Sequence, residues 1–128
     1  MKIRLLVLLF APLLAHAGKL PCDVPEQPGD VREAQCAIAA TDRAQALSFK
    51  VLFAGGHDDT SASMTLKLDG QPMTCDPGSK TRLFAEDGNV FLECRFQLPA
   101  GKPHALGADV VWSHAQYTAI ELHAEDLK

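Results

Sequence analysis

Short runs in which every second residue is apolar, separated by turn residues, limit most strongly what this 128-residue chain can fold into. The longest such run carries Val90, Leu92, Cys94, Phe96 and Leu98 on one face. A period of two is the signature of a β-strand with one buried face. About seven such runs with regular turn signals predict a mainly β domain, an antiparallel sandwich, for which an immunoglobulin-like arrangement is the commonest solution.

Turn residues divide the runs at defined places. Asp69-Gly70 and Asp87-Gly88 each separate two apolar runs, and these residue pairs tolerate the positive φ of a tight hairpin. Pro72 follows the first turn and lacks a backbone N–H, so the returning strand is expected to be short or at a sheet edge. The sequence thus indicates two hairpins in the middle of the chain.

Residues 31–46 can be interpreted in two ways. Asp30 and Glu33 have the spacing of a capping box, and the alanine-rich stretch that follows has good helix propensity. Cys36, Ile38 and Ala40 also alternate as they would in a strand. We expect a short N-terminal helix here, with a strand as the alternative.

The N-terminus predicts export. Lys2 and Arg4 precede a ten-residue apolar run, and Ala15-His16-Ala17 has the small-x-small form of a signal-peptidase site. We therefore expect residues 1–17 to be a cleaved signal peptide, 18–30 to be an extended arm rich in proline, and 31–128 to form a single β-rich domain. The predicted location is the periplasm or the extracellular medium.

The cysteine count agrees with an oxidising compartment. All four cysteines, Cys22, Cys36, Cys75 and Cys94, lie beyond residue 17, and an even number predicts two disulfides. We favour Cys22 with Cys36 and Cys75 with Cys94, because each pair closes a short loop worth about 3 kcal/mol in the chain-entropy model. The chain has no C-x-x-C spacing, which disfavours a redox centre or a zinc ribbon.

Charge narrows the choice of partner. Without Lys2 and Arg4 the chain keeps ten basic residues against sixteen acidic ones, a net charge of −6. Such a balance repels phosphate backbones and anionic lipid, so we expect no nucleic-acid partner and no membrane insertion. A protein partner with a basic surface fits better.

Residues that could carry out chemistry are sparse. No serine stands in a G-x-S-x-G or S-x-x-K frame, so we expect no enzyme, no catalytic residues and no cofactor. The most polar loop contains His57, Asp58 and Asp59 after two glycines. Adjacent residues in an extended segment point to opposite sides, which makes this loop a poor chelate and more plausible as a contact loop.

Metal binding is the alternative function. The chain offers His57, His104, His114 and His123 with Met64 and Met73, and these are ligand types that copper or zinc accept. No H-x-H, H-x-x-x-H or M-x-x-M spacing groups them, so we assign no metal ligands.

The favoured function is protein–protein interaction in the cell envelope. Tyr117, Glu121 and His123 fall on one face of the last apolar run, and we predict this outward face, together with the loop 57–61, as the contact surface. Small size and acidity suit an inhibitor or an immunity protein for a secreted or periplasmic toxin or enzyme, and an accessory subunit of an envelope complex fits as well.

Overall fold

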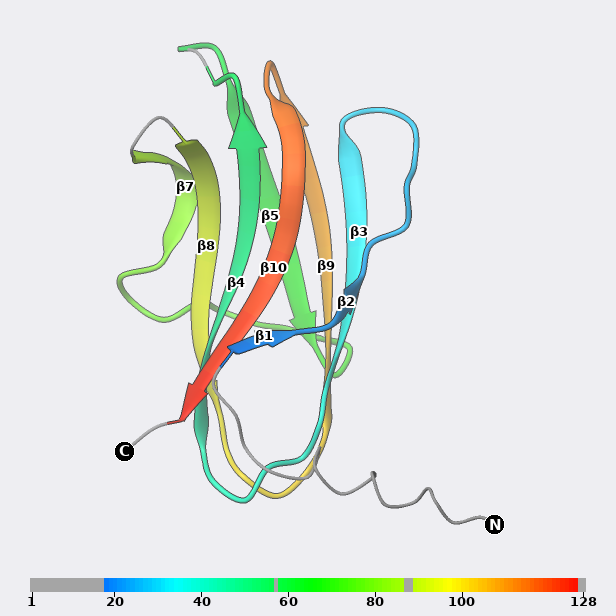
Figure 1. Ribbon diagram of the computed structural model, residues 1–128, viewed down its shortest axis with the longest axis vertical. Coiled ribbons are helices and arrows are strands. Elements are labelled where there is room, and N and C mark those ends of the chain that lie inside the picture. Colours follow the sequence, from blue (N-terminus) through cyan, green and yellow to red (C-terminus); the bar gives the residue numbers. More distant parts are fainter. Residues whose placement is uncertain (1–17, 57, 87–88, 127–128) are drawn as a thin grey trace.

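A computed structural model describes residues 18–56, 58–86 and 89–126, and within them the chain forms strands and no helix (Figure 1). The strands are β1 (Gly18–Leu20), β2 (Cys22–Asp23), β3 (Val31–Ile38), β4 (Gln45–Ala54), β5 (Ser61–Leu68), β6 (Gln71–Pro72), β7 (Lys80–Glu86), β8 (Asn89–Leu98), β9 (His104–Ser113) and β10 (Gln116–Asp126). They form two antiparallel sheets. Sheet A has the order β1-β10-β4-β8-β7, and sheet B has the order β2-β3-β9-β5-β6.

The core lies between the two sheets, as the alternating pattern predicts. In β4, Phe49 and Val51 are fully buried while their neighbours are partly exposed. In β8, Leu92 and Cys94 are fully buried, and Leu106 of β9 meets them from sheet B's side of the core. The predicted antiparallel sandwich is therefore confirmed, because every second side chain of the facing strands enters one apolar layer between the two sheets.

The predicted helix in residues 31–46 is wrong. Residues 31–38 form β3, which pairs with β9 along its whole length and buries Ala34, Cys36 and Ile38. The supposed cap does not form, because the Asp30 carbonyl accepts the Trp112 N–H at 3.1 Å instead. Burial of every second side chain against the opposite sheet outweighs the helix propensity of the alanines, which is small per residue.

Both predicted disulfides are confirmed. Cys22 of β2 lies directly opposite Cys36 of β3, so this bridge joins the N-terminal arm to sheet B. The Cys75–Cys94 bridge joins the segment between β6 and β7 to the buried side of β8. Strand β1, at the start of residues 18–30, pairs with β10 in sheet A.

Some predictions fall on residues outside the described part. The signal peptide at 1–17 and the Asp87-Gly88 turn lie there, and the domain boundaries stay a prediction. Among the described residues there is no helix that is both long and apolar enough to cross a bilayer.

The Asp69-Gly70 turn has the predicted geometry, with positive φ at both residues, and Pro72 lies in the short edge strand β6. The Asp69 carboxylate accepts the Ala105 N–H at 2.9 Å and lies 2.6 Å from Nδ1 of His104. The hydrogen bond to His104, followed by that from Ala105, lowers the pKa of Asp69 below its ordinary value. This turn is thereby joined to the start of β9.

The disulfide assignment predicts the thiol count of the exported chain. Denatured without reductant, it should show no thiol reactive toward Ellman's reagent, and reduction should release four per molecule. A count near two in the unreduced protein would mean that one bridge does not form.

The Asp69 contacts predict a dependence of stability on pH. Because the pKa of Asp69 is lower in the folded chain, its charge stabilises the fold above the ordinary value of 3.8, and this contribution is lost as the pH falls through the lowered value. Asp69→Asn, which tolerates positive φ, should unfold at lower urea concentration than the wild type at pH 6, with the gap closing below about pH 4. A gap of equal size at both pH values would refute this role.

Candidate functional site

The predicted contact loop lies far from His123, one of the other predicted contact residues. His57 is outside the described residues, and Asp58 and Asp59 are exposed at the end of the sandwich where β4 ends and β10 begins (Figure 1). The Asp59 carboxylate lies 3.7 Å from Nε2 of His114, and both side chains are largely exposed. His123 lies seven residues farther along β10 than Gln116, about 23 Å at the rise of a strand. The loop and His123 therefore lie too far apart to form one site.

The prediction that Tyr117 shares the outward face with Glu121 and His123 is wrong. A bulge between Tyr117 and Ala119 shifts the register, so that Tyr117 lies opposite the buried Phe53. Its ring stacks on Trp112 with centroids 5.5 Å apart, and the Arg32 guanidinium lies 5.0 Å from its centroid. Burial raises the pKa of Tyr117. This tyrosine closes one end of the core.

Glu121 and His123 do lie on the outward face of sheet A. Nε2 of His123 is 3.0 Å from Oε1 of Glu121, and the Lys19 ammonium of β1 is 3.9 Å from the other carboxylate oxygen. The hydrogen bond with His123 is the main cause of a lowered pKa at Glu121. Lys50 of β4 lies directly opposite Glu121 in the sheet.

Charged side chains continue from Glu121 across the whole sheet. In the register of sheet A, Glu121 of β10, Lys50 of β4, Glu93 of β8 and Lys80 of β7 lie opposite one another in turn. We call these four residues the charged ladder. Opposite charges on neighbouring strands stabilise a sheet by about 0.2–1 kcal/mol per pair. The register therefore alternates negative and positive side chains across four strands of the outward face.

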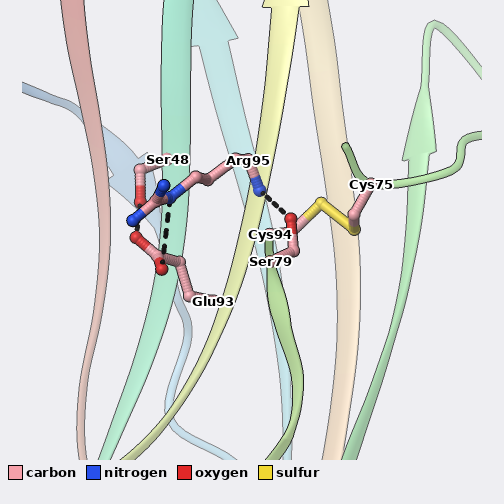
Figure 2. The surroundings of a disulfide bond; sticks show 6 residues. All are labelled: Ser48, Cys75, Ser79, Glu93, Cys94 and Arg95. Atoms are coloured by element: carbon pink, nitrogen blue, oxygen red, sulfur yellow. Dashed lines mark hydrogen bonds and ion pairs between the residues drawn. A yellow bond between two sulfur atoms is a disulfide. The ribbon is translucent and has the colours of Figure 1, made fainter. Parts of the chain in front are cut away.

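The middle of the face contains a cluster that the sequence did not reveal. The Ser48 hydroxyl donates to Oε2 of Glu93 at 2.7 Å, and Nε of Arg95 lies 3.4 Å from Oε1 of the same carboxylate (Figure 2). Glu93 is only 7% exposed although it points away from the core. Ser48 and Arg95 lie opposite each other in β4 and β8, and only the register shows that they meet.

One end of the outward face is apolar. The Phe84 ring of edge strand β7 packs edge-on against Phe91 of β8, with centroids 5.4 Å apart, and Leu52 of β4 lies opposite Phe91. The Lys50 and Lys80 ammonium groups lie about 5 Å from the two rings. Phe84 keeps 38% of its surface exposed, which makes it an unusually accessible aromatic side chain for this chain.

The other end of the face is hollowed into a cleft of about 470 Å³, which we call the polar cleft. Its polar lining residues are Ser48, Asp76, Glu93, Arg95, Gln97, His123 and Glu125. The wall at Asp76 is held in place by the Cys75–Cys94 bridge and by the Asp76 N–H, which donates to the Arg95 carbonyl at 2.7 Å. The Arg95 N–H donates to the hydroxyl of Ser79 on the same segment (Figure 2).

The hydroxyl of Ser48 in the cleft is not paired with an imidazole. Ser48 lies opposite His123 in the sheet, but its hydroxyl donates to Glu93, so the serine orients a carboxylate instead of giving its proton to the imidazole. Within the described residues no three histidine, cysteine, aspartate or glutamate side chains gather as a metal ion would require.

Comparison with known proteins gives no family. No family model matches the chain, and no curated protein matches it. Among solved structures it is similar to a family 35 carbohydrate binding module from an environmental isolate, with 11% identity, a TM-score of 0.47, and coverage of 86% of this chain and 77% of that one. The CBM35 from Cellvibrio japonicus Abf62 gives 10% identity and a TM-score of 0.43, covering 89% and 90% of the two chains. At this level of likeness no ligand transfers to this chain.

The stacking of Tyr117 predicts a structural role. Tyr117→Ala should lower the free energy of unfolding by roughly 1–3 kcal/mol, because it removes a half-buried ring from Trp112 and Arg32. Urea unfolding measures this, with Thr118→Ala at the exposed bulge residue as a control that should change stability by less than about 0.5 kcal/mol. Equal stability of the wild type and Tyr117→Ala would contradict the structural role and leave Tyr117 as a candidate contact residue.

Proposed function

We propose that this chain is a non-enzymatic binding protein that docks a protein partner on the outward face of sheet A. The observation that carries the proposal is that an aromatic pair with one exposed ring, a charged ladder and a polar cleft lie on one face. Aromatic anchors surrounded by polar groups are typical of the residues that dominate the affinity of protein interfaces.

Preorganisation supports the same face. The Glu93 carboxylate is held by Ser48 and Arg95, and the two lysines of the ladder lie against phenylalanine rings. Side chains already held in one arrangement lose little conformational entropy when a partner docks. Most of the conformational entropy of these side chains is therefore already lost when the chain folds, before a partner binds.

Among the described residues, the outward face of sheet B presents no exposed aromatic ring. Small side chains line its strands β5 and β9, including Ser61, Ser63 and Ala105, and Gly107 has none. Its large exposed apolar residue is Val111, which is 47% exposed. Single exposed apolar residues are ordinary on protein surfaces, so sheet A is the better candidate for docking.

The class of partner follows from charge and compartment. Residues 18–128 carry sixteen acidic and ten basic side chains, which disfavours phosphate-rich partners and favours a protein with a basic surface. The two disulfides suit an oxidising compartment such as the periplasm or the cell exterior. An exported enzyme or toxin held by this chain as an inhibitor or immunity protein is the specific role that we propose.

Crosslinking from each sheet in turn tests the proposal. A photoreactive amino acid replaces Phe84 on sheet A or Val111 on sheet B, the exposed large apolar residues of the two faces. Expressed in the native host and illuminated, the protein labelled at position 84 should yield one stoichiometric protein adduct, and the protein labelled at 111 should yield none.

The controls separate docking from chance contact. Glu121→Lys, which reverses one acidic charge of the ladder, should reduce the adduct from position 84 by several-fold, because the proposed partner has a basic surface, while the chain still folds, as its circular dichroism would show. Equal adducts from both positions, or an adduct with polysaccharide in place of protein, would overturn the proposal.

A further inference from the structure

We infer that the polar cleft receives one long cationic side chain, an arginine or a lysine, from the docked partner. This inference rests on the proposed function and names the chemistry read at one end of the same face. The cleft, at about 470 Å³, lies within the range of roughly 300–1,000 Å³ typical of ligand sites, so a single extended side chain fits with accompanying water.

The first argument is the pairing of Glu93. Its side chain is only 9% exposed, and a carboxylate removed from water needs strong partners at both oxygens. Ser48 donates to Oε2 at 2.7 Å, but the donor to Oε1, Nε of Arg95, stands at 3.4 Å. A charge-assisted N–H···O bond is about 2.7–2.9 Å long. Oε1 can therefore accept a further, closer donor.

The second argument is the charge of the lining. Asp76, Glu93 and Glu125 contribute three carboxylates and Arg95 one guanidinium, so the cleft has a formal charge of −2 with His123 neutral. The side-chain carboxylates of Asp76 and Glu125 have no hydrogen bond or ion pair in the part of the chain that the structure describes. An incoming cation would pair with carboxylates that have no partner within the chain.

The third argument is the construction of the wall. Asp76 belongs to a segment fixed by a disulfide and by two hydrogen bonds to the Arg95 backbone: the Asp76 N–H donates to the Arg95 carbonyl, and the Arg95 N–H donates to the Ser79 hydroxyl. Its position relative to Glu93 is therefore set before any partner arrives. An anion entering the cleft would meet Arg95 but also these three carboxylates, so repulsion disfavours it.

A small probe tests the cleft apart from the whole interface. ¹⁵N-labelled protein at constant ionic strength and pH 7.5 is titrated with N-acetyl-arginine amide, and amide shifts are followed by NMR. We expect saturable shifts at Ala46, Ser48 and Gln97, which surround the cleft, with an affinity on the order of millimolar.

Matched double variants identify the groups responsible. Asp76→Asn with Glu125→Gln removes two charges from the cleft and should weaken the probe roughly fivefold or more. Glu33→Gln with Asp109→Asn removes the same charge from exposed positions on sheet B and should leave the affinity unchanged. Equal weakening in both double variants, or shifts that do not saturate, would overturn the inference.

Other probes distinguish the remaining occupants. Acetate and xylobiose, titrated in the same way, should leave the cleft amides unmoved, and saturable binding of either in place of the arginine probe would refute the cationic occupant. The adduct from position 84 remains the separate test of docking. If that adduct persists at full yield in Asp76→Asn with Glu125→Gln, the face docks a partner without the cleft, and only the inference fails.

Discussion

The alternation of side chains along β8 is the constraint on which both the fold and the candidate site depend. Leu92 and Cys94 enter the core, so Glu93 and Arg95 must point outward. A shift of one residue in the pairing of β8 with β4 would bury a carboxylate and a guanidinium and expose the apolar row. Burial of the apolar row therefore also fixes the register that brings Arg95 opposite Ser48.

The Cys75–Cys94 bridge links the buried side of β8 to the wall of the polar cleft. Cys94 lies between two residues of the outward cluster, and its sulfur reaches the opposite side of the strand to hold the segment that contains Asp76. Loop closure of this length stabilises a fold by about 3 kcal/mol in the chain-entropy model. Here the same bond also positions one wall of the cleft, so a stabilising feature of the fold shapes the surface.

Local pattern was enough to predict the strands, the sandwich, the edge position of Pro72 and the two disulfides, because period two and short loop closure are properties of adjacent residues. It failed at residues 31–38, where alanine propensity and alternation conflict and only the facing strand β9 decides between them. It also failed at Tyr117, because one inserted residue in a bulge reverses the face of every residue before it.

Only part of the candidate site could be predicted from the sequence. Glu121 and His123 follow from alternation in one strand, whereas Glu93 and Ser48 meet only through a register that no single segment encodes.

The burial of Glu93 on a surface that faces solvent has a structural cause and a functional consequence. Ser48 and Arg95 contact this carboxylate, and only 9% of the Glu93 side chain stays exposed although it lies outside the core. A charge covered in this way interacts more strongly with a cation that reaches it than an exposed carboxylate would, since less water screens the pair.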